Sequence, residues 1–168
     1  MTKRARVVLS LPLALAACTA PEPYSGEVPT GPPHAERGFG EPAKVTTTAI
    51  GSGVPVEWEV TVAKPVLVDA TYSCFPVTLT PTFIGDYPVD VTVTVPTITP
   101  VADDQNANFV QDASVCGNAD SLSGYLGDLK VGREVHTFVA SWTGDGVPAT
   151  GVRVDTDRQR VSWGGGRG

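Results

Sequence analysis

Asp104, Asn106 and Asn108 are the residues whose types and spacing come closest to a metal site. Oxygen-bearing side chains at positions 1, 3 and 5 have the spacing of an EF-hand calcium loop. That loop also needs Gly at position 6 and Glu at position 12, where this chain has Phe109 and Val115. A polar turn between strands explains the same residues, because Asn and Asp favour turn conformations. We therefore interpret the segment as a turn, keep a weak calcium site at Asp104, Asn106 and Asn108 as the alternative, and expect no cofactor.

Side chains that could form a hydrolytic site are few. His136 is the one histidine in the later part of the chain, and it shares a strand face with Trp142, so we interpret it as an edge or packed histidine. Asp155 and Asp157 could serve a glycosidase, although two acids on one strand face are more often solvated. Motifs for a nucleophile elbow, a zinc protease or a phosphate loop are absent from the sequence. These observations predict a protein that is not an enzyme.

Cys18 ends a pattern that directs export. Three basic residues near the N-terminus precede an apolar run over the 11 residues 7–17. This run is shorter than the roughly 20 residues of a membrane-spanning helix and is typical of a secretory signal. Leu15-Ala16-Ala17-Cys18 resembles a bacterial lipobox, where signal peptidase cuts before the cysteine and the thiol receives a diacylglycerol. The resemblance implies a lipoprotein signal peptide over residues 1–17 and lipidation of Cys18, with an ordinary secretory signal as the alternative.

The charge balance excludes nucleic acid as a partner. The chain has 18 acidic and 12 basic residues, a formal charge of −6. Removal of residues 1–17 takes away Lys3, Arg4 and Arg6 but no acid, which leaves −9. Phosphates require clustered Lys and Arg, which this chain lacks. We expect a protein on the extracytoplasmic side of the cell membrane, held there by the lipid on Cys18.

Residues 18–42 lack the hydrophobic periodicity of a folded segment. Six of the residues from 19 to 42 are proline and four are glycine. Such a segment cannot bury enough apolar surface to offset the entropy of ordering it. The composition predicts a disordered or partly polyproline tether that holds the body of the protein away from the membrane.

Residues 43–168 alternate apolar and polar side chains with the period of a β-strand. Val and Thr are frequent, as in sheets, and Gly and Pro mark the turns. Repeated short strands predict an all-β, antiparallel β-sandwich domain of about seven to nine strands. The expected strands cover residues 44–50, 56–62, 66–72, 76–84, 89–95, 107–113, 134–142, 150–156 and 159–163. Residues 117–133 are expected to form a loop or a short helical turn, and Pro81, Pro96 and Pro100 to mark bulges, edges or strand ends.

Cys74 and Cys116 are the two cysteines left in the exported domain. An even pair in an oxidising compartment predicts a disulfide. Neither cysteine has CxxC spacing, so redox catalysis and zinc binding are not expected.

The aromatic residues are expected mainly in the core. Trp58, Trp142 and Trp163 occupy strand-like positions and predict core or sandwich-end packing. A second group lies near Cys74 and the Gly85 turn, and it would form a recognition patch if several members were exposed. That group is Tyr72, Phe75, Phe83 and Tyr87.

Several segments resemble the immunoglobulin-like domains of actinobacterial lipoproteins and secreted envelope antigens. The segments are Val56 to Val62, Val77 to Thr80, Gly85 to Val89, Leu129 to Glu134 with Phe138-Val139, and Val152 to Trp163. The resemblance implies an immunoglobulin-like β-sandwich, and such proteins are described as envelope or immunogenic proteins of unknown function. Together with the lipobox it predicts a non-enzymatic binding or interaction module whose partner is a protein or ligand of the envelope. An envelope hydrolase with a carboxylate-based site and a carrier of a small ligand or ion are the alternatives.

Overall fold

The computed structural model describes residues 21–68, 70–102, 105–110, 113–144 and 148–164. These residues form ten strands and two short 3₁₀ helices. In chain order the elements are β1 (His34–Arg37), β2 (Pro42–Thr48), β3 (Pro55–Val62), β4 (Val66–Val68), β5 (Tyr72–Ile84), β6 (Thr97–Ala102), β7 (Gln105–Asn106), η1 (Ala113–Cys116), η2 (Leu126–Asp128), β8 (Val135–Trp142), β9 (Gly151–Asp155) and β10 (Arg160–Gly164).

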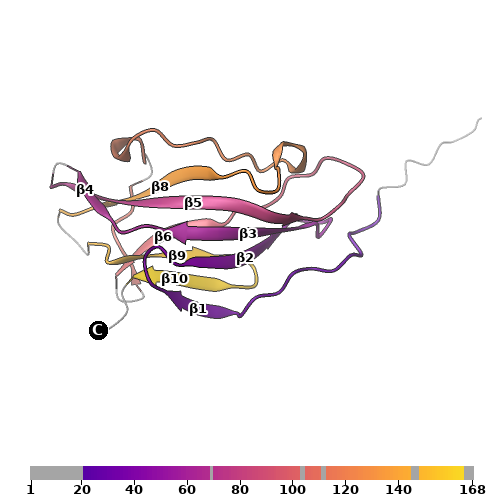
Figure 1. Ribbon diagram of the computed structural model, residues 1–168, viewed down its shortest axis with the longest axis horizontal. Helices are drawn as coiled ribbons and strands as arrows, with labels where there is room; N and C mark the ends of the chain where they lie inside the picture. The colour runs from indigo at the N-terminus through magenta and orange to yellow at the C-terminus, as the bar shows by residue number, and fades with distance from the viewer. Residues whose placement is uncertain (1–20, 69, 103–104, 111–112, 145–147, 165–168) are drawn as a thin grey trace, which may run out of the picture.

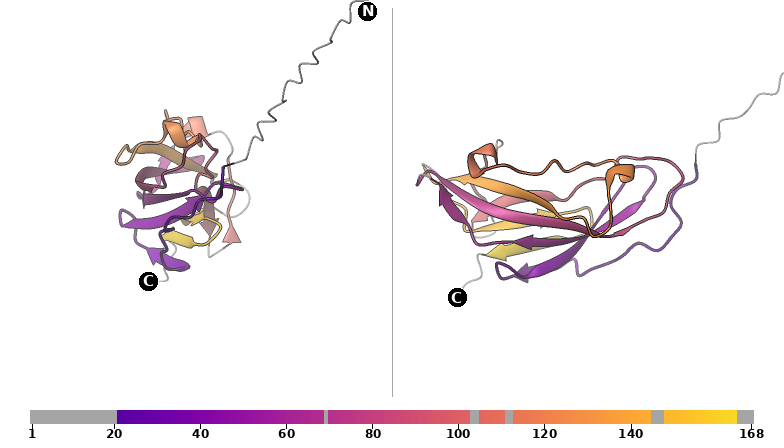
Figure 2. Two further views of the ribbon diagram at one scale, coloured as in Figure 1. Left: turned by 90° about the vertical axis from the view of Figure 1, so that its right-hand side faces the viewer. Right: turned by 45° about the horizontal axis from the view of Figure 1, so that its top comes forward.

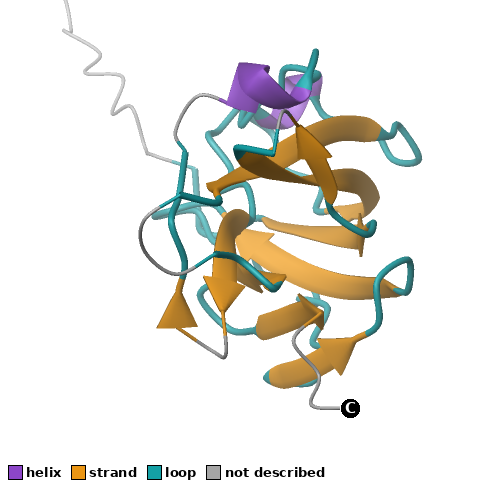
Figure 3. Ribbon diagram, turned by 90° about the vertical axis from the view of Figure 1, so that its left-hand side faces the viewer, coloured by secondary structure: helices purple, strands orange, loops and turns teal. Residues whose placement is uncertain are grey.

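The strands form two sheets that pack against each other (Figure 1, Figure 3). We call them sheet A, with strand order β1-β10-β9-β6-β7, and sheet B, with strand order β2-β3-β5-β4 and β8 on the other edge of β5. The first described residues and the end of β10 lie toward opposite ends of the long axis (Figure 2). The predicted all-β sandwich is confirmed, with ten strands in the described residues where seven to nine were expected.

The core lies between the sheets and is made by every second residue of their central strands. Trp58 and Phe75 of sheet B and Trp163 of sheet A are fully buried together with a set of valines from both sheets. The indole N–H of Trp58 donates to Oγ1 of Thr47 at 2.9 Å, and that of Trp163 donates to the carbonyl of Glu41 at 2.8 Å. Both large rings are therefore buried without an unpaired donor.

The N-terminal segment differs from the predicted disordered tether. Arg37 ends β1, which pairs in parallel with β10, so the sandwich is not purely antiparallel. Before β1, the Tyr24 amide donates to Ser52 at 2.7 Å and the Pro29 carbonyl accepts from Thr46 at 3.0 Å. Tyr24, Ala35 and Phe39 pack against the core. The prediction of a tether is wrong over residues 21–42, because apolar residues too sparse to form their own core pack against the core of the sandwich.

Two predicted strands are not formed as ladders. Residues 89–95 make only isolated bridges at Thr92 and Val93. Burial alternates as the sequence suggests from residue 90 to 95, with Val93 buried, but Val89 is exposed. The segment connects β5 to β6, and the Val93 amide donates to the Gly124 carbonyl at 2.6 Å. In the expected strand 107–113, Val110 makes one bridge to Ala140, and a 3₁₀ helix begins at Ala113. The strand β6, which pairs with β9, was not among the expected strands, because Pro96 and Pro100 lie next to it and within it.

Pro81 lies at a β-bulge, as predicted. Trp58 pairs with Pro81 while Glu57 pairs with Phe83, so Thr82 is the extra residue of β5. Pro96 immediately precedes β6, and η2 lies within the region expected to be a loop or short helical turn. Pro81 and Pro96 therefore marked irregularities correctly, because proline cannot donate a ladder hydrogen bond. Pro100 instead lies inside β6, where it pairs with Val152 without a register shift.

Candidate functional site

The outward face of sheet A carries two rows of polar side chains. Val152, Val154, Val161 and Trp163 point into the core, and their neighbours in β9 and β10 therefore point outward. The first row across the sheet is His34, Arg160, Asp155 and Thr97, and the second is Glu36, Ser162, Arg153 and Thr99. Four strands thus place charged and hydroxyl side chains on one face.

Asp155 lies between two arginines in these rows. Nε of Arg153 donates to its Oδ2 at 2.7 Å, and Nε of Arg160 donates to its Oδ1 at 2.8 Å. Nη2 of Arg153 also donates to the side-chain oxygen of Asn106 at 2.9 Å. Only 15% of the Arg153 side chain is exposed, against 54% of Arg160. The network therefore has a buried, fixed arginine and an accessible one.

The ion pairs change the acidity of Asp155. Partial burial is the largest single effect and raises the pKa of its carboxyl, but the hydrogen bonds and charges of Arg160 and Arg153 outweigh it and lower the pKa. A glycosidase general acid needs the opposite shift. The other member of the predicted acid pair, Asp157, accepts from Thr48 at 3.2 Å and lies 3.6 Å from Arg158. The two acids thus have separate partners.

A hollow of about 490 Å³ opens beside the network. Its lining, which we call the arginine hollow, is His34, Ala35, Glu36, Arg153, Arg160 and Ser162. In the part of the chain that the structure describes, Nη1 and Nη2 of Arg160 have no hydrogen-bond partner. The Asp155 carboxylate fixes the guanidinium at Nε, so the two terminal nitrogens can receive another group.

A second hollow of about 390 Å³ lies around η2, at the loops that precede β8. It is lined by cationic Lys130 and Arg133 and by Asp128, which accepts from the Ser123 hydroxyl at 2.8 Å. Most of its lining is loop, whereas the arginine hollow is built on β1, β9 and β10. Side chains on strands are held more precisely than side chains on loops, so the arginine hollow is the better candidate site.

The three residues of the predicted calcium loop are not all described. Asp104 lies outside the described residues. The side-chain oxygen of Asn106 accepts from Arg153, and the amide of Asn108 donates to the Trp142 carbonyl at 3.3 Å. Among the described residues, no three His, Cys, Asp or Glu side chains are grouped so that they could hold a metal ion. The weak calcium site remains a prediction.

His136 is exposed on the outer face of sheet B, where it connects a hydroxyl and a carboxylate. Its Nδ1 lies 3.2 Å from Oγ1 of Thr78, and its Nε2 lies 3.5 Å from Glu134. Its backbone N–H donates to Asp120 at 2.8 Å. The residue lies on an edge strand, as expected, and it lines neither of the two hollows described above.

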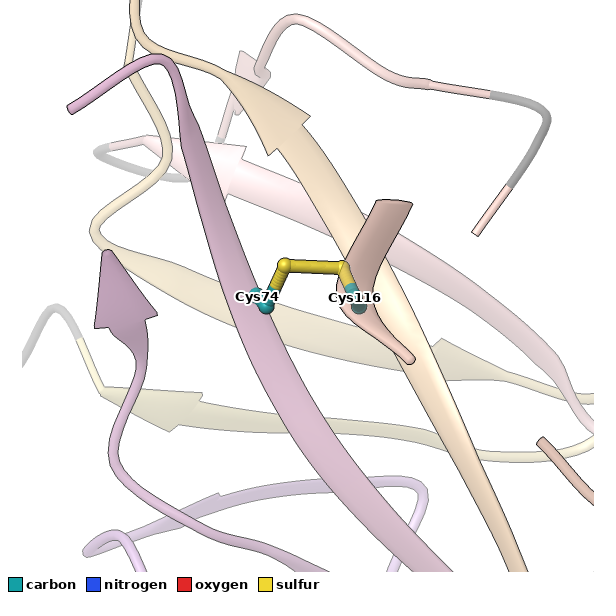
Figure 4. Close-up of a disulfide and its surroundings, with 2 residues drawn as sticks. All are labelled: Cys74 and Cys116. Carbon is teal, nitrogen blue, oxygen red and sulfur yellow. A yellow bond between two sulfur atoms is a disulfide. The ribbon is translucent and has the colours of Figure 1, made fainter. Parts of the chain in front are cut away.

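Cys74 and Cys116 form a disulfide, as predicted, with their Cα atoms 5.6 Å apart. Figure 4 shows that the bridge joins β5 to η1. The disulfide therefore holds the segment between β7 and β8 on the edge of sheet B. Cys18 lies outside the described residues, so its lipidation remains a prediction.

The aromatic residues divide differently from the prediction. Trp58 and Trp163 are core residues, but Trp142 is 41% exposed at the end of β8, so its expected packing was wrong. Its indole ring lies beside Gly144, which follows the end of β8. In the group near Cys74, Phe75 is fully buried against Phe39 and Phe83 is exposed. Tyr72 and Tyr87 are partly buried, so the four aromatic residues differ in exposure.

Comparisons of the chain with protein-family models, with curated proteins and with solved structures found no match. No helix in the described ranges has the length and apolar character needed to cross a membrane. The function must therefore be argued from the site.

Sequence reasoning did not identify the arginine hollow. The sequence predicts strands at Arg153 and Arg160 and a tether at His34, but no binding role for these side chains. Within β9, Arg153 and Asp155 alternate with buried valines, and this pattern indicates that both charged side chains share the outward face. The pairing of β1 with β10 brings His34 and Glu36 to the same face. No local sequence pattern predicts this pairing.

Proposed function

We propose that the protein is a lipid-anchored lipoprotein of the cell membrane whose β-sandwich is a non-enzymatic binding module. The arginine hollow is the observation that carries the proposal. It combines a concave surface with an ion-pair network that holds its cationic groups in place, and ligand sites are usually such preformed concave surfaces with a few convergent polar groups. Its volume of about 490 Å³ lies within the usual range for small ligands.

The lowered pKa of Asp155 favours binding over the hydrolase alternative. The carboxylate is used to fix two guanidinium groups, and its charged form is stabilised. A general acid has to keep its proton near neutral pH. Asp155, which lies beside the hollow, therefore supports recognition and does not favour proton transfer.

The packed N-terminal segment brings the domain closer to the membrane than a disordered tether would. Only Thr19 and Ala20 separate Cys18 from Pro21, where the described chain begins. Three residue steps span at most about 11 Å when fully extended. If Cys18 carries lipid, the end of the sandwich that contacts Tyr24 faces the bilayer, because Tyr24 is bonded there to Ser52.

The anchor is tested by Cys18→Ser in cells fed an alkyne-bearing fatty acid. We expect label and membrane sedimentation for the parent protein and loss of both for the variant. Cys116→Ser is the matched control, because it removes a body cysteine and should leave the label in place. Label that persists in Cys18→Ser would overturn the anchor.

The binding module is tested by photo-crosslinking in intact cells from position 162, on the face of sheet A. The control position is Thr80, which lies on β5 of sheet B and pairs with Glu59. We expect one dominant adduct from position 162 and none from position 80. Equal, diffuse labelling from both positions, or turnover of envelope glycans, esters or peptides lost in Asp155→Asn, would contradict a non-enzymatic module.

A further inference from the structure

The arginine hollow contains one accessible guanidinium end. Arg160 donates from Nε to Asp155, which leaves its terminal nitrogens without a partner in the described ranges. A planar guanidinium presents its two terminal N–H groups in a geometry that matches the two oxygens of a carboxylate. The fixed Nε bond orients this end before any ligand arrives, so less side-chain entropy is lost on binding.

The other charges of the hollow limit the ligand to a small negative charge. Asp155 and Glu36 balance Arg153 and Arg160, and the whole chain carries −6. A polyanion would gain from Arg160 but would be repelled by Glu36 in the same lining. Ser162 and His34 provide polar contacts beside the guanidinium.

We propose that the arginine hollow binds a ligand that carries a single carboxylate next to neutral amide or hydroxyl groups, with the carboxylate on Nη1 and Nη2 of Arg160. Two kinds of compound have this chemistry: the free C-terminus of a peptide and a uronic acid. The inference rests on the proposed binding function and gives its ligand class.

The test is an NMR titration of the mature chain, residues 18–168 with Cys18→Ser. The probes are acetyl-trialanine with a free carboxylate, the same peptide as its C-terminal amide, glucuronic acid and inorganic phosphate. Titration to roughly 10 mM detects affinities in the millimolar range, which correspond to about −4 kcal/mol. We expect saturable shifts at residues 34–36 and 160–162 with the free peptide or glucuronic acid, and the stronger of the two identifies the source.

Arg160→Gln should weaken that binding roughly tenfold or more, since a charge-assisted pair is lost. Arg160→Lys keeps the positive charge but loses the paired terminal N–H groups of the guanidinium. Its affinity should lie between those of the parent and Arg160→Gln. Arg158→Gln makes the same charge change two residues away and should bind like the parent. Each variant is first checked for an unchanged melting temperature. A variant with a lowered melting temperature is replaced by Ser162→Asp, which places a negative charge in the hollow and should repel the carboxylate.

Equal shifts with the amide, equal or tighter binding of phosphate, or no effect of Arg160→Gln and Ser162→Asp would overturn the inference. A protein that shows no carboxylate binding but still crosslinks selectively from position 162 would refute this ligand class and leave the binding module intact. Loss of the selective crosslink together with persisting carboxylate binding would refute the binding module in the cell and leave the ligand class intact.

Discussion

Gln159 closes the gap between the two sheets by binding the backbone of Thr46. Its side-chain oxygen accepts from the Thr46 amide at 2.7 Å, and its amide lies 3.4 Å from the Pro32 carbonyl. Gln159 is only 5% exposed. The side chain of the residue that precedes β10 of sheet A thus satisfies the open edge of β2 in sheet B.

We predict that Gln159→Ala lowers the free energy of unfolding by about 1–3 kcal/mol, because it leaves the Thr46 amide buried without an acceptor. Urea denaturation followed by tryptophan fluorescence measures the change. Gln105→Ala is the matched control, since Gln105 is exposed on β7 and should change stability by less than about 0.5 kcal/mol. A loss as small for Gln159→Ala as for the control would show that water replaces the side chain.

The packed N-terminal segment predicts slow hydrogen exchange at Arg160. Its amide donates to the Pro33 carbonyl at 2.8 Å, a bond that exists only if residues 21–33 are docked. We expect protection of this amide comparable with that of Val154 in the middle of sheet A. Deletion of residues 19–33 should abolish the protection at Arg160 and leave that at Val154. Rapid exchange at Arg160 in the intact chain would restore the original interpretation of this segment as a disordered tether.

The Cys74–Cys116 disulfide predicts a large effect of reduction on stability. The bridge closes a loop with a sequence separation of 42, for which the chain-entropy model gives about 4 kcal/mol. Unfolding by urea with and without reductant measures this difference. The double variant Cys74→Ala/Cys116→Ala should match the reduced protein and be insensitive to reductant. In the unfolded oxidised Cys18→Ser protein, titration should find no free thiol; two free thiols would exclude the bridge.

The lowered pKa of Asp155 predicts that the folded protein loses stability in acid. Its folded-state pKa is lowered, so the stabilisation is complete above its ordinary value of about 3.9 and is lost as the pH falls through the folded-state pKa. We expect the free energy of unfolding to fall less steeply below pH 4 in Asp155→Asn than in the parent. Asp157→Asn, which makes the same charge change two residues away, is the matched control. Parallel curves for the parent and Asp155→Asn would mean that the two arginines do not favour the Asp155 charge.

The amino-acid sequence by itself determined the fold class and the disulfide pair. Alternation along a strand depends on residues two apart, so the pattern from Val56 to Val62 predicted β3 directly. The two cysteines of residues 43–168 allowed one intramolecular pairing. The same alternation predicted that Val91, Val93 and Val95 turn inward, but not that the segment lacks a sheet ladder or that Val89 is exposed. Burial alternates with the chain's own period, whereas a ladder also requires another strand in register.

Only the tertiary structure decided the docked N-terminal segment and the arginine hollow. His34 and Arg160 are far apart in sequence, and their contact depends on a parallel pairing that no local pattern specifies. Apolar residues as sparse as Tyr24 and Phe39 cannot order a segment alone, but they can when a finished sandwich offers sites for them. The candidate site therefore arises from long-range packing, because its side chains converge only after both sheets are assembled.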